Sequence, residues 1–155
     1  MRVHEVSFPL YLNNKDLIDQ IETIGMAFNK YNNDINVKVR SFRCCSIALN
    51  KTKIVSIGIN RAKTSPQYEE YAKRQKLTIH AEIDMIMNIE RAKDFKKVTD
   101  IYIIRGYSQL LPSMPCPLCA SYLAKKFKSK TRINYYTESG WASSTLEELA
   151  LKYGT

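Results

Sequence analysis

Near the start of the chain, apolar residues recur every three or four positions, which is the period of an amphipathic helix. The residues on this face are Leu17, Ile21, Ile24, Phe28 and Tyr31. The pattern predicts a helix over about residues 15–31, and Asn13 or Asn14 could cap its first turn.

Two short runs rich in β-branched and apolar residues follow, at Cys44–Leu49 and Ile54–Ile59. The polar residues 50–53 between them predict a hairpin turn. Residues 61–78 are polar and form a long connection for a compact domain, so we expect a substrate loop there. One short helix is expected within it, around Glu69–Gln75.

Helix and strand patterns alternate through the rest of the chain. In order they are a helix over about 80–92, a strand at 100–104, a helix from Cys116, a strand at 132–136 and a helix from 144 to about 153. The strand at 100–104 is continuously apolar, which predicts burial on both faces. A capping box at Ser144–Glu147 predicts the start of the last helix. No fifth strand is evident after Tyr136.

This alternation predicts an α/β fold with parallel neighbouring strands and right-handed crossovers. Ligands then bind at the carboxyl ends of the strands. Two groups of metal-ligating residues lie at predicted helix starts on that side. They are His80-Ala81-Glu82 and Pro115-Cys116-Pro117-Leu118-Cys119.

The residue types in these groups suit a catalytic zinc ion. One imidazole and two thiolates fill three positions of a tetrahedron and leave the fourth for water, whose pKa zinc lowers. Unpaired N–H groups at the start of a helix favour the thiolate form of Cys116 and Cys119. Glu82 lies beside His80 and could carry protons without being a ligand. A His-x-Glu segment followed by Pro-Cys-x-x-Cys is typical of zinc-dependent nucleobase deaminases.

Other interpretations of the cysteines remain open. A C-x-x-C pair alone also fits a redox site or half of a structural zinc ribbon. The sequence has no second C-x-x-C, and His80 precedes Cys116 by 36 residues in the expected order. Cys44 and Cys45 lie in a predicted strand and point to opposite faces, and a fourth ligand from this pair would close the open position.

The length of 155 residues predicts one domain spanning residues 1–155, large enough for a hydrophobic core. With 45% hydrophobic and 25% charged residues, the composition is that of an ordinary globular protein. No apolar run approaches the ~18 residues of a membrane span. Residues 1–5 lack the apolar core of a signal peptide. Four cysteines, two of them needed as thiolates, suit a reducing compartment, so we expect a cytoplasmic protein without a membrane partner.

The formal net charge is +9, with basic clusters at Lys73–Lys76 and along Lys125–Arg132. A positive field of this size favours phosphorylated partners, from a mononucleotide to a polynucleotide. Lysines that simply solvate the outer faces of helices explain the same composition. Charge alone does not separate these alternatives.

Over nearly all of its length, the chain resembles the cytidine deaminase-like superfamily. Gly58-Ile59-Asn60, ahead of His80, is similar to the G-x-N element of deoxycytidylate and nucleic-acid deaminases. The run Gly58–Pro66, together with Pro115–Pro117, is most similar to phage and other viral deaminases. The resemblance implies a three-layer α/β sandwich, with a mixed sheet of four to five strands flanked by helices. It also implies assembly into a homo-oligomer.

The same resemblance implies a role for each motif residue. His80, Cys116 and Cys119 would hold Zn²⁺, and Glu82 would shuttle protons. Asn60 would hydrogen-bond a sugar and the Ala81 backbone would contact the base.

Two residues and one segment outside the metal site need separate comment. Asn60 could instead cap a turn at the end of its strand. Trp141 follows Gly140 in a predicted polar loop and is a candidate for stacking a base. Residues 111–114 depart from the family's usual Thr or Ser and Glu positions, so the resemblance assigns no residue here to the contacts near the amine.

The leading hypothesis is hydrolytic deamination of a cytosine nucleotide or nucleoside, with deoxycytidylate favoured because the chain is basic. A second is deamination of a cytosine or adenine in single-stranded DNA or RNA, bound along residues 125–132. A third is a non-catalytic protein that is stabilised by zinc and binds nucleotides. An intact Glu82 speaks against the third hypothesis.

Overall fold

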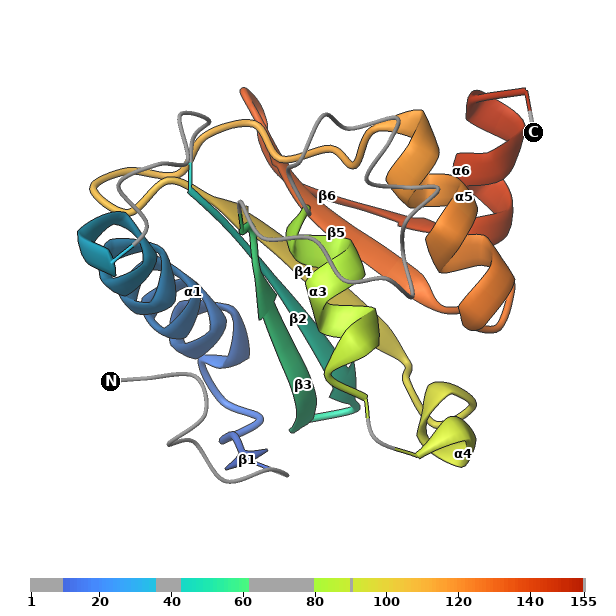
Figure 1. Ribbon diagram of the computed structural model, residues 1–155, viewed down its shortest axis with the longest axis horizontal. Coiled ribbons are helices and arrows are strands. Elements are labelled where there is room, and N and C mark those ends of the chain that lie inside the picture. The colour runs from blue at the N-terminus through green and yellow to red at the C-terminus, as the bar shows by residue number, and fades with distance from the viewer. Residues whose placement is uncertain (1–9, 36–42, 62–79, 90, 155) are drawn as a thin grey trace.

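The computed structural model describes residues 10–35, 43–61, 80–89 and 91–154 (Figure 1). Its strands are β1 (Leu10–Tyr11), β2 (Cys44–Asn50), β3 (Lys53–Ile59), β4 (Asp100–Arg105), β5 (Arg132–Thr137) and β6 (Gly140–Thr145). Its helices are α1 (Leu17–Ile35), α3 (Ala81–Met87), α4 (Ala92–Phe95), α5 (Pro117–Lys126) and α6 (Leu146–Lys152). The substrate loop and short helix expected within 61–78 lie outside the described residues, apart from Arg61.

The strands form one mixed sheet in the order β1-β3-β2-β4-β5-β6. Helix α1 packs on one face and α3, α5 and α6 pack on the other, which confirms the expected three-layer α/β architecture (Figure 1). The hairpin at residues 50–53 is confirmed by the antiparallel pairing of β2 with β3. Strands β4 and β5 are parallel neighbours, as expected for a strand–helix–strand unit.

One expected neighbour relation is wrong. Strands β3 and β4 are joined through α3, but β2 lies between them and pairs antiparallel with both. Within the hairpin, β2 pairs with the edge of β3 that is nearer to β4. Strand β4 therefore pairs with β2 and not with β3. The carboxyl ends of β3 and β4 still meet at one edge of the sheet, together with the first residue of β2.

The sheet has two strands more than the four evident in the sequence. Strand β6 forms a hairpin with β5 through a turn in which Gly140 has a φ of 106°. Its residues are half-buried or exposed, so they show none of the apolar run that marks β4. Strand β1 is two residues long and pairs with the start of β3.

The predicted helix boundaries also move, and the helix expected over 15–31 spans Leu17–Ile35. The helix expected over 80–92 ends at Met87, where the Asn88 amide donates to the Ile57 carbonyl at 2.9 Å and ties the chain to the sheet. The last helix is capped by Thr145 with Glu148, one residue later than the predicted box. Ser144 still pairs with Ile133 in β6, so the helix cannot start there.

The core has two halves, one on each face of the sheet. Ile101 and Ile103 of β4 face α3 and α5, whereas Tyr102 and Ile104 face α1, so the predicted burial on both faces is confirmed. Gly58 brings α3 directly onto β3: a Cβ there would lie 2.1 Å from the Met85 nitrogen. This close approach sets the start of α3 beside the end of β3.

Within the described ranges, no helix is both long and apolar enough to cross a bilayer.

Candidate active site

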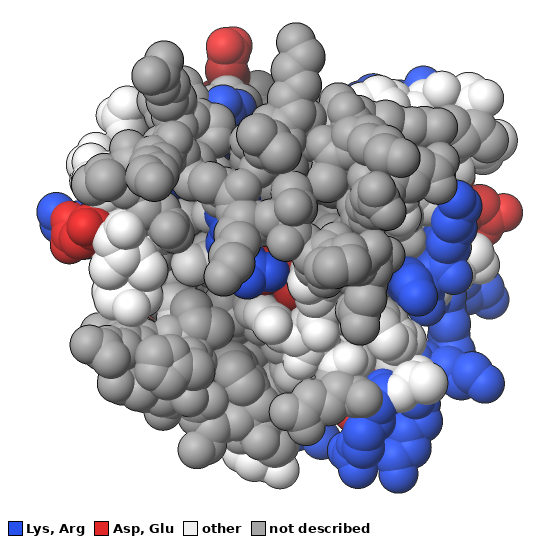
Figure 2. Space-filling model, viewed as in Figure 1, with Lys and Arg blue, Asp and Glu red and all other residues white. Residues whose placement is uncertain are grey.

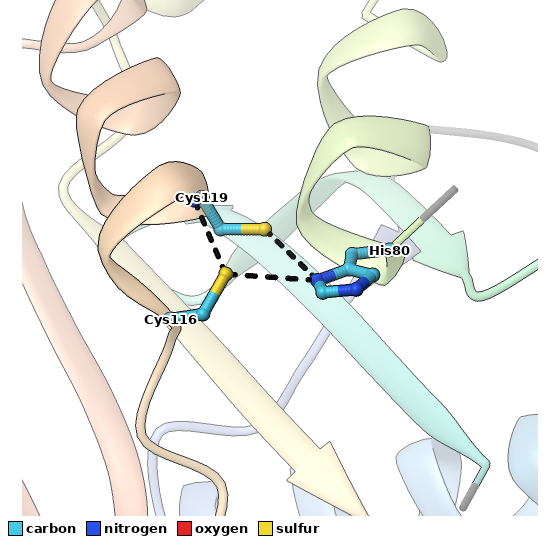
Figure 3. A group of neighbouring side chains, drawn as sticks. All are labelled: His80, Cys116 and Cys119. Carbon is cyan, nitrogen blue, oxygen red and sulfur yellow. Dashed lines mark hydrogen bonds between the residues drawn. The ribbon is translucent and has the colours of Figure 1, made fainter. Parts of the chain in front are cut away.

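The starts of α3 and α5 converge at the edge of the sheet where β3 and β4 end. His80 is the N-cap residue of α3 and Cys116 is the N-cap residue of α5. The Cys116 sulfur accepts a hydrogen bond from the Cys119 backbone N–H at 3.4 Å. Figure 3 shows the three side chains pointing toward one another from the two helices.

The spacing of these side chains fits one zinc ion. His80 Nδ1 lies 3.2 Å from Cys119 Sγ and 3.8 Å from Cys116 Sγ, and all three ligand atoms lie within 4.8 Å of one another. Tetrahedral zinc, with bonds of about 2.3 Å to sulfur and about 2.0 Å to nitrogen, would place nitrogen and sulfur about 3.6 Å apart. The donor set and its spacing therefore fit a metal held through His80 Nδ1.

The pKa of the Cys116 thiol is shifted in the opposite direction from those of Cys44 and Cys45. A hydrogen bond from the Cys119 side chain, helped by His80 and a backbone N–H, lowers the pKa of Cys116 to about 4. Burial raises the pKa of both Cys44 and Cys45, so these two remain neutral thiols. Cys45 faces α1 on the other side of the sheet. Among the described residues, the predicted alternative of a fourth cysteine ligand has no geometric support.

Glu82 lies in the first turn of α3 and is only 4% exposed. Burial raises the pKa of this carboxyl group, and the nearby charge of His80 opposes the rise. A carboxyl group whose pKa is shifted toward neutrality both accepts and releases a proton more evenly in that range. Its environment therefore suits an acid–base group.

These residues line a cavity of about 210 Å³ at the edge of the sheet. The lining comprises Cys44, Asn60, His80, Ala81, Glu82, Ile103, Arg105, Ser113, Met114 and Cys116. It includes five of the seven residues singled out from the sequence, and Cys119 lies against it in the metal-ligand group. Of these seven residues, Trp141 alone does not lie at the cavity or in the metal-ligand group.

Trp141 lies on β6, so the loop predicted for it is wrong. Its indole N–H donates to Glu22 Oε1 at 2.7 Å, and its ring meets Tyr102 and Tyr136 edge-on, with centroids 5.6 and 5.7 Å away. It packs against the core on the α1 face, whereas the cavity is lined by the first residues of α3 and the N-cap of α5. In this structure, Trp141 joins β6 to α1.

Asn60 both ties neighbouring segments together and lies at the cavity wall. Its Oδ1 accepts from the Cys44 N–H at 3.0 Å and from the Asn32 amide at 2.9 Å, so it holds the strand ends together. The same residue lines the cavity.

Sequence reasoning missed the residues that hold Asn60 in place. Asn32, fully buried on α1, donates to both the side-chain and the backbone oxygen of Asn60. From the other face, the Asp84 carboxylate accepts from the Ile59 N–H at 2.9 Å and pairs with Arg61 at 2.6 Å. The available signal for Asn32 was its place four residues after Phe28, on the face of α1 that the apolar period marks as buried.

Two further residues hold the segment that precedes Cys116. Ser113 Oγ donates to the Ile103 carbonyl at 2.7 Å and accepts from the Tyr136 N–H at 2.8 Å. The Tyr153 hydroxyl donates to the Pro115 carbonyl. The segment 111–115 is thereby fixed to β4, β5 and the end of α6. Nothing in the local sequence around Tyr153 indicated this contact.

No protein-family model and no curated protein matches the chain. Solved structures do: it is similar to a cytidine deaminase from Mycobacterium leprae, with 19% identity, coverage of 84% of this chain and 94% of that one, and a TM-score of 0.58. It is also similar to a cytidine deaminase from Burkholderia pseudomallei, with 13% identity, coverage of 81% of this chain and 93% of that one, and a TM-score of 0.56. A third similar structure is a point mutant of the cytidine deaminase from Mycobacterium tuberculosis, with 17% identity, coverage of 81% of this chain and 91% of that one, and a TM-score of 0.52. The chain thus has the fold of these cytidine deaminases.

Proposed function

We propose that this protein is a zinc-dependent hydrolase that deaminates the cytosine ring of a nucleotide or nucleoside, with deoxycytidylate as the favoured substrate. The observation that carries the proposal is the meeting of His80, Cys116 and Cys119 beside the buried Glu82 in one cavity. A fold shared with solved cytidine deaminases supports it.

His80, Cys116 and Cys119 would hold the zinc ion, which supplies Lewis-acid activation of water near neutral pH. Glu82 takes a proton from the attacking water and passes it to the ring nitrogen next to the amine-bearing carbon. Glu82 then assists transfer of a proton to the departing amine. The water oxygen becomes the new carbonyl oxygen of the uracil ring, the carbon–nitrogen bond breaks and ammonia leaves.

The remaining lining residues orient the substrate. The backbone of Ala81 would contact the base and Asn60 would bind the sugar, since both line the cavity with Glu82. Asn60 Oδ1 accepts two hydrogen bonds, which fix the orientation of the side-chain amide at the cavity wall. Asn32 then acts through Asn60 as a positioning residue.

Replacing Asn32 by alanine should lower both stability and turnover. Two buried oxygens of Asn60 lose their amide donor, which costs about 1–3 kcal/mol of unfolding free energy. Because Asn60 loses its orientation, kcat/KM should fall mainly through a higher KM, while zinc content stays unchanged. Ser56→Ala is the matched control, since its hydroxyl donates to the Met85 carbonyl at 2.8 Å and does not line the cavity. Equal kinetic parameters for both variants would show that Asn32 does not act on substrate binding through Asn60.

A 5′-phosphate is favoured by Arg105, which lies at the end of β4 and lines the cavity. A guanidinium group is suited to bind phosphate through two parallel hydrogen bonds. This cation, together with the net charge of +9, favours deoxycytidylate over an uncharged nucleoside. The proposal also includes the phage or viral type, the cytoplasmic location and the homo-oligomer expected from the sequence.

The substrate assignment is tested by ammonia release from deoxycytidylate, deoxycytidine and a cytosine-containing single-stranded oligonucleotide. Deoxycytidylate should react with the highest kcat/KM and with a modest dependence on salt. The variant Arg105→Gln should raise KM for deoxycytidylate about 10-fold, which corresponds to one charge-assisted hydrogen bond of about 1.4 kcal/mol. It should leave KM for deoxycytidine unchanged, and Arg132→Gln serves as the control at an exposed arginine. An equal effect on both monomers would reject phosphate recognition by Arg105.

A base in single-stranded DNA or RNA is the second candidate substrate, because Lys125–Arg132 is strongly basic. A polymer substrate should lose affinity with salt by a slope of ~0.7 per phosphate contact. Turnover of the oligonucleotide with none of either monomer would reverse the ranking. The non-catalytic alternative is disfavoured by Glu82, because a structural zinc site has no use for a buried acid in the adjoining cavity.

A further inference from the structure

Almost all of the chain's net charge comes from one stretch of sequence. Residues 91–132 contain ten of the 24 basic residues but two of the 15 acidic ones, which gives +8 of the total +9. The residues outside this stretch therefore carry a net charge of only +1. Figure 2 shows lysine and arginine side chains gathered at the right and lower right, over the region where Figure 1 places α4 and the end of α5.

Nine exposed residues form what we call the basic surface: Arg91, Lys93, Lys96, Lys97, Lys125, Lys126, Lys128, Lys130 and Arg132. The set has two parts in the sequence, residues 91–97 and residues 125–132, and these parts lie side by side in the structure. The rings of Phe95 and Phe127 pack with centroids 5.2 Å apart, and Lys126 Nζ lies 5.8 Å from the Phe95 centroid. The Arg132 N–H donates to the Thr99 carbonyl at 3.0 Å.

The two acidic residues of the stretch do little to neutralise this surface. Asp94 is paired with Arg91 at 3.0 Å, at the margin of the set. Asp100 accepts a hydrogen bond from the Asn134 amide at 3.2 Å. From outside the stretch, exposed Glu147 of α6 adjoins the α5–β5 connection, since its backbone N–H donates to the Ser129 carbonyl at 3.0 Å. The nine basic residues still outnumber these acidic neighbours, so the surface keeps a positive field.

We infer that the basic surface binds the phosphate backbone of a polynucleotide. Dense lysines without an apolar centre suit phosphate contacts that release counterions. A protein partner is less suited, because the cores of protein interfaces are depleted in lysine. A lipid surface is less suited, because membrane binding by a helix uses apolar side chains. None of the exposed large hydrophobic residues among those described belongs to α4, α5 or the connection from α5 to β5.

The basic surface and the cavity lie at opposite ends of α5. The ten residues of this helix span about 15 Å, with Cys116 at its start and Lys125 and Lys126 at its end. Backbone binding there does not by itself bring a base to Glu82. The inference therefore goes beyond the proposed function and stands independently of it.

The test is binding of a fluorescent oligothymidylate, which contains no cytosine, to the full chain. Non-specific affinities are about 10⁻⁴–10⁻⁶ M at physiological salt and tighten at about 50 mM salt. The triple variant Lys125→Gln, Lys128→Gln, Lys130→Gln should bind at least ~10-fold more weakly at low salt. Its slope of log affinity against log salt should fall by about 2, since each lost phosphate contact removes ~0.7. Deamination of deoxycytidylate should be unchanged.

The control is Lys15→Gln, Lys30→Gln, Lys152→Gln, which removes the same charge from exposed positions elsewhere. It should keep both the affinity and the slope close to the wild type. Equal weakening of the two variants would overturn the inference, because net charge alone would then explain binding. Absence of oligonucleotide binding at low salt, or binding only to phosphatidylserine vesicles or polyglutamate, would overturn it too. A catalytically inactive protein that binds the oligonucleotide as described would still support it.

Discussion

Glu82→Gln should abolish deamination while the metal site and the fold remain intact. Glutamine has the size of glutamate and keeps hydrogen-bonding capacity, so the first turn of α3 can keep its packing. It cannot accept the proton of the attacking water or return one to the ring nitrogen. Loss of one acid–base group typically costs ~10²–10⁴ in rate. Because Glu82 would move several protons in one turnover, we expect a loss at or beyond the upper end.

The measurement is single-turnover release of ammonia from deoxycytidylate, with zinc content and thermal unfolding recorded on the same preparations. Glu22→Gln is the control, since Glu22 accepts the Trp141 indole hydrogen bond on the opposite face of the sheet. It should keep full activity. An active wild type together with a Glu82→Gln variant of similar rate would refute the role of Glu82.

Cys119→Ala should remove the zinc and much of the stability that depends on it. Cys119 is fully buried, and its sulfur is the ligand atom nearest to His80 Nδ1. Changes to outer-shell partners already cost about 10–100-fold in metal affinity, so loss of a ligand should cost more. Metal-binding free energy is coupled to folding, so the melting temperature should also fall and should no longer respond to a chelator.

Cys45→Ala provides the matched comparison, because Cys45 is equally buried but lies on the α1 face. It should lose stability through the cavity it creates and still bind zinc in a one-to-one ratio. Elemental analysis of the two purified variants decides the matter. Stoichiometric zinc in Cys119→Ala would show that the ligand assignment is wrong.

The elements that carry the site were predictable because their signals are local. His80 and Cys116 lie at helix starts that could be located from the apolar period and from the proline after Cys116. The G-x-N element was recognisable as a pattern, and the structure gives a physical reason for its glycine. At Gly58, the backbone of α3 approaches too closely for any side chain.

What could not be predicted depends on contacts between distant parts of the chain. Strand β6 is an edge strand that mixes polar and apolar residues, so its sequence resembles a polar loop around Trp141. The hydrogen bond from Trp141 to Glu22 joins residues 119 positions apart and leaves no local signal. Asn32 and Tyr153 contact Asn60 and Pro115 over 28 and 38 positions in the sequence. Periodicity reports which face of a helix is buried, but not which polar partner a buried amide or hydroxyl will meet.

In the proposed function, a zinc ion held by His80, Cys116 and Cys119 activates water, and Glu82 carries the protons needed to deaminate a cytosine monomer. The most direct measurement is conversion of deoxycytidylate to deoxyuridylate by the purified protein, before chelation, after chelation and after zinc is returned. We expect conversion with release of ammonia, its loss when zinc is removed and its recovery when zinc is restored. A zinc-loaded, folded protein that converts neither deoxycytidylate nor deoxycytidine would contradict the claim.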